Sequence, residues 1–301
     1  MRVLITGVSG FIGPHIIETC VARGWDVWGV DIRDFDYEAI AFDFKTPQFV
    51  FEKRDVRSLT QQELEGVDYI IHLAFVTNIP NSIRDPLATT HDNIDMTALL
   101  LDLATKAKIK KFVFATTASL YGHNPTPWNE AMQPYPIEPY SWQKLSGEYA
   151  LKMWSACYGL KTVGLRLFQV FGENQRTDTA MAAFFRARKE GRAITLTETT
   201  AQSSFRSGQR DFVYVKDVAD AFARAAESDT VGSGEIINIG TGKVTTMEDI
   251  ATAIGGEIVF IPKRGFEVER HEADITHARE LLGWEPRVEV IPWLTEFVKT
   301  L

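Results

Sequence analysis

The chain has 301 residues, of which 45% are hydrophobic and 24% charged, and its formal net charge is −8. Because about 150 residues is a soft expectation for one domain, this length indicates one large domain or two closely packed domains and excludes a small binding module. The composition is typical of a globular protein, not of a disordered or collagen-like chain. The acidic balance, without a long basic block, argues against a nucleic-acid partner.

The cysteine content and the start of the chain suggest a location. Only Cys20 and Cys157 are present, too few for a disulfide framework or a cysteine-based zinc site, which fits a reducing compartment. Met1 leads directly into an apolar strand, and no apolar stretch approaches the roughly 18 residues of a membrane span. We therefore expect a cytoplasmic protein with no membrane contact and no metal.

Short apolar runs alternate with amphipathic stretches of helix length from the start of the chain. Strands are expected at Arg2–Thr6, 26–30, 69–73, 111–116 and Thr162–Leu167, and helices at 11–23, 91–106 and 141–157. Parallel strands need crossovers, and right-handed helical crossovers cover both faces of a sheet. The first half of the chain thus predicts an α/β fold with a doubly wound, Rossmann-type parallel sheet.

The alternation becomes less regular after Gly172. Helices are expected at 180–190, Met247–Ile254 and 275–281, a strand followed by a helix within 212–227, and a strand at 235–239. This pattern predicts a first domain of residues 1–171 with a returning segment, 212–240, and a smaller α/β lobe of residues 172–211 and 241–301. Residues 75–90 and 197–208 are expected to be loops.

A glycine-rich turn directly follows the first strand. Gly7, Gly10 and Gly13 form a G-x-x-G-x-x-G pattern that opens a helix, with Pro14 in its first turn. Glycines there permit a tight turn and a close approach to pyrophosphate, and the helix N-terminus offers free N–H groups to the anion. Asp31, at the end of the second strand, can accept the ribose hydroxyls of NAD and repels the 2′-phosphate of NADP, although Arg33 nearby weakens that discrimination.

Tyr140 and Lys144 are the first candidates for catalysis. Their spacing of four places both on one face of a helix, although such a pair alone is a weak indication because it also arises by chance. An ammonium a few Å from a phenol favours the phenolate, a base that can take a hydroxyl proton during hydride transfer. Thr117, at the carboxyl end of the strand expected at 111–116, could bridge Tyr140 and a substrate.

The whole chain resembles the extended short-chain dehydrogenase/reductase family, the nucleotide-sugar epimerases and dehydratases. The resemblance is carried by TGVSGFIG with Asp31, the Asp55-Val56 pair, HLA from His72, Asn93, TTASLYG from Thr116, PYSWQK ending at Lys144, LRLFQVFG from Leu165, RDFVYVKDVA from Arg210 and NIGTG from Asn238. It implies NAD as cofactor, a homodimer whose surface includes helices 91–106 and 141–157, and a catalytic set of Thr117, Tyr140 and Lys144.

The resemblance also implies the binding residues. Those for the cofactor are Gly7, Gly10, Phe11, Ile12, Gly13, Asp31, Ile32, Asp55, Val56, Leu73, Ala74, Phe75, Asn93, Tyr140 and Lys144. Those for a nucleotide-diphosphate sugar are Thr117, Gln169, Arg210, Arg264 and His271. Gln169 stands where the family usually has asparagine, and His271 where epimerases limit the bulk of the sugar's 2-substituent.

The residues after the catalytic hydroxyl bear on the type of reaction. Family dehydratases and decarboxylases carry acidic residues there, whereas this chain has Ala118 and Ser119, neither of which is a carboxylic acid. The pattern favours epimerisation at carbon 4 of a UDP-glucose or UDP-galactose type substrate through a transient 4-keto sugar. Two alternatives stay open: an NAD(P)H-dependent reductase of nucleotide-linked 4-ketosugars, and a non-catalytic protein that senses NAD(P).

Overall fold

The computed structural model describes residues 1–199, 206–262 and 268–300. Its centre is a seven-stranded sheet in the order β11-β6-β5-β4-β1-β2-β3, in which all neighbours are parallel. The strands are β1 (Arg2–Thr6), β2 (Asp26–Asp31), β3 (Phe49–Lys53), β4 (Tyr69–His72), β5 (Lys111–Thr117), β6 (Thr162–Leu167) and β11 (Ser233–Ile239). The predicted doubly wound α/β sheet is confirmed.

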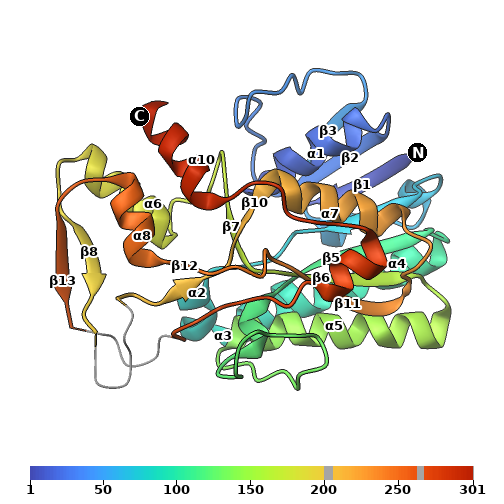
Figure 1. Ribbon diagram of the computed structural model, residues 1–301. Helices are drawn as coiled ribbons and strands as arrows, with labels where there is room; N and C mark the ends of the chain where they lie inside the picture. The colour runs from blue at the N-terminus through green and yellow to red at the C-terminus, as the bar shows by residue number, and fades with distance from the viewer. Residues whose placement is uncertain (200–205, 263–267, 301) are drawn as a thin grey trace.

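Helices cover both faces of this sheet (Figure 1). On one face, α1 (Gly13–Ala22) packs against α7 (Val215–Glu227); on the other, α4 (Met96–Lys106) packs against α5 (Pro139–Tyr158). Each face of the sheet has its own hydrophobic core, and the side chains of β1 point alternately into the two. Val3 and Ile5 pack in the core beside α1 and α7, and Leu4 packs in the core beside α4 and α5. Because both faces are buried, these strands are continuous apolar runs.

The segment 75–90, expected to be a loop, contains two short helices instead, α2 (Ile79–Arg84) and α3 (Pro86–Thr90). Asn78 caps α2 by accepting a hydrogen bond from the Asn81 N–H, and Asp85 caps α3 in the same way from the Ala88 N–H. Each helix also has proline in its first turn, where a missing N–H costs little. The loop prediction was wrong because these Asx-then-proline start signals were overlooked.

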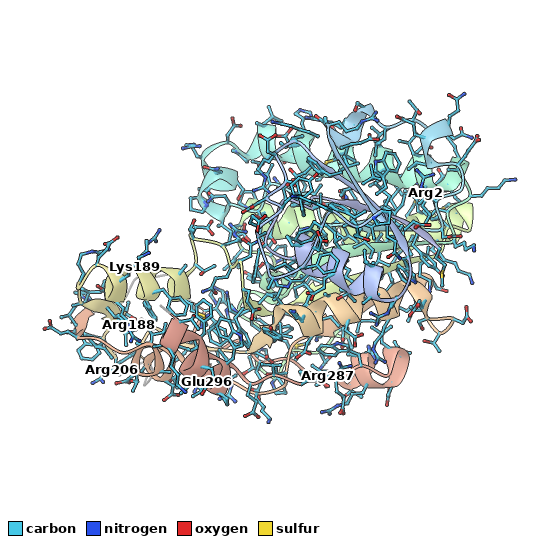
Figure 2. The ribbon with its side chains drawn as sticks, turned by 90° about the horizontal axis from the view of Figure 1, so that it is seen from above. Arg2, Arg188, Lys189, Arg206, Arg287 and Glu296 are labelled. Carbon is cyan, nitrogen blue, oxygen red and sulfur yellow. The ribbon has the colours of Figure 1, made fainter. Side chains whose placement is uncertain are left out.

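A small lobe lies beside the sheet, and we define it as α6 (Ala180–Lys189), β8 (Ile194–Thr197), α8 (Met247–Ile254), β13 (Ile258–Ile261) and α10 (Val290–Phe297). It has a core of its own that includes Phe184, Leu196 and Ile250. Figure 2 shows it apart from the sheet, with Arg188 and Lys189 at one end of the molecule and Arg2 at the other. The pairing of β8 with β13, two segments far apart in the chain, was not predicted.

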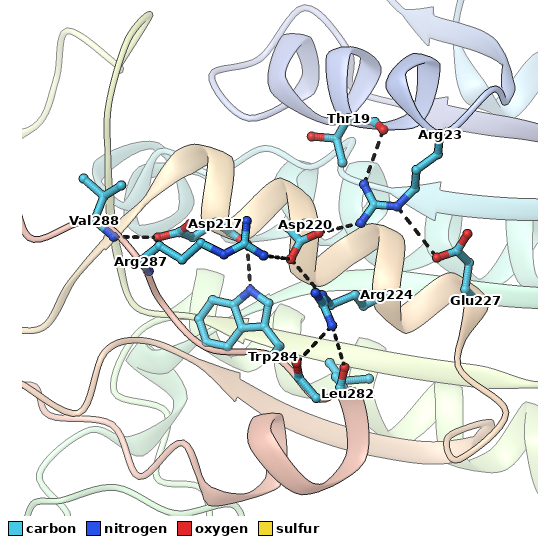
Figure 3. A network of polar contacts seen from close by, with 11 residues as sticks. Thr19, Arg23, Asp217, Asp220, Arg224, Glu227, Leu282, Trp284, Arg287 and Val288 are labelled. Carbon is cyan, nitrogen blue, oxygen red and sulfur yellow. Dashed lines mark hydrogen bonds and ion pairs between the residues drawn. The ribbon is translucent and has the colours of Figure 1, made fainter.

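Two pairs of short strands connect the central sheet with the small lobe. β7 (Gln169–Phe171) pairs with β10 (Phe212–Tyr214), and β9 (Gln209–Arg210) pairs with β12 (Thr245–Thr246). After α9 (Thr276–Leu282), the chain is tied to α7 by a polar network (Figure 3). Asp220 accepts from Arg23, the residue after α1, at 2.5 Å, from Arg224 of α7 at 2.7 Å and from Arg287 at 3.2 Å. This carboxylate joins three segments behind the sheet.

Candidate active site

The glycine turn between β1 and α1 depends on close backbone contacts. Gly7 has φ of +75°, and a Cβ there would lie 2.6 Å from the backbone nitrogen of Ala74; a Cβ on Gly13 would lie 2.2 Å from the carbonyl oxygen of Val8. Only glycine allows these approaches. A Cβ on Gly10 would meet only the Gly7 carbonyl oxygen at 3.1 Å and the Arg33 guanidinium at 3.7 Å, so Gly10 leaves space that a ligand can use.

A cleft of about 760 Å³ opens at this turn. Among the residues predicted to bind the cofactor, those that line it are Gly7, Gly10, Phe11, Ile12, Gly13, Asp31, Ile32, Asp55, Val56, Leu73, Ala74 and Phe75. Its volume lies in the range of pockets that enclose cofactors, and the start of α1 offers its N–H groups to an anion. The residues present therefore fit a dinucleotide.

Asp31 ends β2 at the edge of this cleft. Its carboxylate accepts hydrogen bonds from the Ser9 N–H at 3.0 Å and the Arg33 N–H at 2.9 Å, which orient it. Arg33 lines the same cleft, and its Nε lies 3.4 Å from Asp31 Oδ1 while most of its side chain is exposed. The carboxylate of Asp31, which we expect to bind a ribose, thus lies at the cleft with the Arg33 guanidinium beside it.

Asp55 stands further along the same cleft. It caps the short 3₁₀ turn Val56–Ser58 by accepting from the Arg57 N–H, and the Arg57 guanidinium, 2.7 Å away, lowers the pKa of its carboxyl. Arg57 also contacts Asp92 at 3.1 Å, and both line the cleft. The sequence analysis missed these two residues.

Asn93 lies one layer behind the cleft lining. It is fully buried, its Oδ1 accepts from the Val76 N–H at 2.7 Å, and its Nδ2 donates to Gln143 Oε1 at 2.8 Å. It also sits in a π-helical turn, His91–Asp95, that precedes α4 within the helix expected at 91–106. Asn93 therefore holds the backbone of Val76, which lines the cleft, and does not line the cleft itself.

Thr117 and Tyr140 meet at the carboxyl edge of the sheet. Thr117 is the last residue of β5, and Tyr140 is in the first turn of α5. Burial raises the pKa of the Tyr140 phenol to about 12, while a hydrogen bond with the Thr117 side chain acts in the opposite direction. Thr117 Oγ1 also lies 2.7 Å from the Ser119 hydroxyl, so two neutral hydroxyls accompany the phenol.

Lys144 is buried one turn further along α5. Its Nζ donates to the Ala115 carbonyl oxygen at 2.6 Å and lies 3.5 Å from the ring centroid of Phe75 and 4.5 Å from that of Phe114. Burial lowers its pKa well below the usual value. The ring of Phe75 also makes an edge contact with Tyr140, so one aromatic side chain touches both members of the expected pair.

Two further charged groups act on Tyr140, and the sequence analysis missed both. Glu138 raises the pKa of the phenol, and Arg176 lowers it. Glu138 caps α5 through its Oε1, and burial raises the pKa of its carboxyl. Arg176 belongs to the segment 174–178, all of which lines the cleft and none of which carries a periodic signal in the sequence.

Of the predicted sugar-nucleotide residues, Arg210 and His271 come together although 61 positions separate them. The His271 N–H donates to the Gln209 carbonyl at 3.1 Å, and the nearby Arg210 together with burial lowers the pKa of His271 to about 3. The His271 ring lies 4.9 Å from that of Trp128, a fully buried residue that the sequence analysis did not identify.

Two predicted residues remain to be placed. Gln169 begins β7, and its N–H donates to the Asp211 carbonyl at 3.0 Å, next to Arg210. Arg264 lies outside the described residues, as do 200–205 of the expected loop 197–208. Within 1–199, 206–262 and 268–300, no cluster of three His, Cys, Asp or Glu side chains could hold a metal ion, and no helix has the length and apolarity to cross a bilayer.

Comparisons with known proteins agree with this geometry. Residues 3–240 match the profile of the NAD dependent epimerase/dehydratase family. A UDP-glucose 4-epimerase of Mycolicibacterium smegmatis is 31% identical over 99% of this chain and 98% of its own length.

Two solved structures have the same fold over nearly their full length. A UDP-glucose 4-epimerase with UDP-glucose from Thermotoga maritima superposes with a TM-score of 0.87 at 30% identity, covering 99% of this chain and 98% of the other. A UDP-N-acetylglucosamine 4-epimerase from Methanobrevibacter ruminantium M1, in complex with UDP-N-acetylmuramic acid, gives a TM-score of 0.89 at 28% identity, with coverage of 99% and 97%.

Proposed function

The chain belongs to the NAD dependent epimerase/dehydratase family, and on that premise we propose that it interconverts the carbon-4 epimers of a UDP-hexose of the glucose/galactose type. It is an NAD-dependent nucleotide-sugar epimerase, and the hexose is the proposed part. The observation that carries the proposal is the hydrogen-bonded Thr117–Tyr140 pair beside the dinucleotide cleft, followed by the neutral Ala118 and Ser119.

When bound, the cofactor NAD would supply reversible acceptance of hydride from carbon 4 of the sugar. We propose that the cleft residues named above hold it, with the glycine turn at the pyrophosphate and Asp31 at a ribose. Asp55 and Val56 are proposed for the adenine end. Asn93 supports the cleft from behind through Val76.

Tyr140 is the proposed base for the 4-hydroxyl proton. Because burial raises the pKa of the phenol to about 12, its ionisation depends on the groups that favour phenolate, the Thr117 hydrogen bond and the Arg176 cation. Thr117 orients the substrate hydroxyl toward the phenol. Lys144, whose Nζ donates to the Ala115 carbonyl oxygen and lies over the ring of Phe75, is the third proposed catalytic residue and would also contact the cofactor.

Arg210, Arg264, Gln169 and His271 are the proposed contacts for the sugar nucleotide. A guanidinium stays charged and can bind two phosphate oxygens, which suits Arg210 and Arg264 for the diphosphate. His271, neutral because of its lowered pKa and packed on Trp128, offers a flat surface of moderate size toward the sugar. This size favours a plain hexose over an N-acetylated one.

The runner-up is a reductase of nucleotide-linked 4-ketosugars, which would use the same residues. Coenzyme stoichiometry separates the two, because epimerisation leaves the oxidation state of the cofactor unchanged. A protein that only senses NAD(P) has less support, because Tyr140 and Lys144 both contact Phe75, which lines the cleft, and Thr117 interacts with Tyr140.

The test is turnover of UDP-, dTDP- and GDP-hexoses with catalytic NAD. We expect UDP-glucose and UDP-galactose to interconvert with no net change in the absorbance of reduced cofactor at 340 nm. Consumption of one NADH per product with a 4-keto substrate would establish the reductase instead, and no turnover of any sugar despite NAD binding would favour the sensing protein.

We also propose a division of the chain, a homodimer and a cytoplasmic location. Residues 1–171 with 212–240 would bind the cofactor, and 172–211 with 241–301 the sugar nucleotide. The dimer surface would include the helical segments 91–106 and 141–157, and the outer face of the second, α5, exposes Trp142, Tyr149 and Met153. Large apolar groups gathered on one helix face are typical of an interface. The free thiols of Cys20 and Cys157 fit a reducing compartment.

A further inference from the structure

The segment 174–178 runs from β7 to the small lobe along the cofactor cleft. It lies between β7 and α6, and its five residues line the cleft together with the glycine turn. Arg176 Nη1 donates to the Thr77 hydroxyl at 2.5 Å, and Thr77 follows β4 of the central sheet. One hydrogen bond therefore joins two parts of the chain that are 99 positions apart.

The guanidinium of Arg176 is fixed on its other side by Asp178. Nε donates to Oδ1 at 2.9 Å and Nη2 to Oδ2 at 2.6 Å, a bidentate pair that orients the whole group. The side chain of Asn78, the neighbour of Thr77, also acts on Asp178 and lowers the pKa of its carboxyl. Arg176 thus attaches the segment to residue 77, and Asp178 fixes the guanidinium that makes this attachment.

The segment is also held at its own end. Thr179 caps α6 by accepting from the Ala182 N–H, and its hydroxyl lies 3.3 Å from the Arg176 carbonyl oxygen. The position of Arg176 is therefore set by the start of α6 as well as by Asp178. A small movement of the lobe would carry the guanidinium with it.

The groups around Tyr140 come from four parts of the chain. Thr117 is on β5, Glu138 is the residue before α5 and caps it, Phe75 follows β4, and Arg176 is on the segment 174–178. The Lys144 ammonium is engaged by the Ala115 carbonyl oxygen and two aromatic rings. Arg176 opposes the Glu138 carboxylate at the phenol.

We propose that Arg176 is a positioning residue of the reaction: it fastens the segment 174–178 over the cofactor cleft through Thr77 and sets a positive charge beside Tyr140. This rests on the proposed epimerase function. An epimerase must retain the reduced cofactor until hydride returns to the sugar, since losing it would strand the 4-keto intermediate. The hydrogen bonds of Arg176 to Thr77 and Asp178, which we call the clasp, hold the segment 174–178 against the cleft and slow that loss. In this arrangement the guanidinium also favours the phenolate form of Tyr140.

Three variants separate the two effects. Thr77→Val removes the acceptor of the hydrogen bond and keeps the positive charge of Arg176. Arg176→Gln removes the guanidinium donor together with its charge. Arg176→Lys keeps the charge but cannot make the two parallel hydrogen bonds to Asp178. Arg192→Gln is the matched control, because Arg192 forms an exposed pair with Glu190 two residues away, outside the cleft lining.

Release of NADH from the loaded enzyme is followed by its fluorescence, without sugar. We expect release to be about tenfold faster in Thr77→Val and all Arg176 variants than in wild type, as loss of one charge-assisted contact predicts, and unchanged in Arg192→Gln. Release at the wild-type rate in both Thr77→Val and Arg176→Gln would overturn the clasp. This readout needs no substrate, so it decides even if no UDP-hexose is turned over.

The pH dependence of kcat tests the charge. A base acts in its ionised form, and loss of the Arg176 cation raises the pKa of Tyr140. The rising limb of the pH profile of kcat therefore moves to higher pH in Arg176→Gln. We expect a shift of about half to one pH unit there, a smaller shift in Thr77→Val, which keeps the cation but loses its fastening, and no shift in Arg176→Lys. If the rising limb of the pH profile stayed in place in Arg176→Gln, the electrostatic role of Arg176 would be overturned. If Thr77→Val shifted the limb as much as Arg176→Gln, the shift would come from the lost hydrogen bond to Thr77 and not from the lost charge.

Discussion

At the scale of single residues, the environment of Tyr140 balances opposite effects. Burial and Glu138 favour the neutral phenol, whereas Thr117 and Arg176 favour the phenolate. Burial raises the pKa of this phenol to about 12, so the groups that favour the phenolate bear directly on its ionisation. The positions of these groups are therefore part of the chemistry.

Tyr140→Phe removes the hydroxyl and keeps the ring that packs on Phe75. Turnover should fall about 100-fold or more, because general acid–base help is lost, while NAD binding and thermal unfolding stay near wild type. Tyr149→Phe, on the exposed face of α5, is the control. Turnover by Tyr140→Phe within a few-fold of the control would contradict the assignment of the base.

Asp31 should decide the preference for NAD over NADP. Asp31→Ala removes a ribose acceptor and a repulsive charge, so the ratio of the two dissociation constants should narrow about tenfold in equilibrium titrations. Asp31→Asn keeps an oxygen that can accept from the Ser9 N–H, so any change in this variant reports the loss of the negative charge alone. Equal affinities for both cofactors in the unmutated protein would show that Arg33 outweighs Asp31.

At the scale of an element, the turn from β1 into α1 assigns different tasks to its glycines. Gly7 and Gly13 permit the backbone to pack against residues 74 and 8, and Gly10 leaves room at the cleft. The same pattern in the sequence thus combines a folding requirement with a binding requirement.

Paired substitutions separate the two requirements. Gly13→Ala places a methyl group 2.2 Å from a backbone oxygen and should destabilise the fold by about 1–3 kcal/mol, measured by urea unfolding. Gly10→Ala places its methyl group 3.1 Å from the Gly7 carbonyl oxygen, so it should cost less stability than Gly13→Ala. It should weaken NAD binding about tenfold or more, because the methyl group occupies space at the pyrophosphate turn. If both variants lost stability equally, Gly10 would have a structural role only.

At the scale of the whole molecule, stability should depend on buried neutral histidines. His72 lies between Thr6 and Thr97, and burial lowers its pKa from 6.5 to about 3; His271 has a similar shift. Between these values the unfolded chain binds protons that the folded protein does not. Stability is therefore complete above about pH 6.5 and falls as the pH drops toward 3.

Urea unfolding between pH 5 and 6.3 measures this effect above the range where most carboxylates titrate. Each such histidine should contribute a slope of up to about 1.4 kcal/mol per pH unit. His72→Gln should lower the slope by about that amount. An unchanged slope in His72→Gln would mean that His72 does not titrate on unfolding.

The proposed dimer is tested on α5. Tyr149→Glu combined with Met153→Glu places charges on the exposed apolar face and should yield a monomer in analytical ultracentrifugation. Val50→Glu, on the exposed part of β3, is the control and should leave the mass unchanged. A dimer that persists in the double variant would place the interface elsewhere, and a monomeric wild type would contradict the dimer itself.

The layered sheet could be predicted from the sequence because its signals are local. The apolar runs of β1, β5 and β6 and the glycine turn each depend on residues close in the chain, and the spacing of Tyr140 and Lys144 needs only a helix. Strand-then-helix alternation leaves few parallel topologies, so the central sheet followed from the pattern. The Asx-proline starts of α2 and α3 were equally local and were overlooked.

Only the tertiary structure decided which distant residues share the site. Arg176 reaches Thr77, and Trp128 packs on His271, through pairs of segments that carry no periodic signal. The placement of Asn93 behind the cleft and the pairing of β8 with β13 have the same origin. Periodicity reports which face of an element is buried, but not which partner buries it. That choice depends on how the whole chain packs, and it determines the charges around Tyr140.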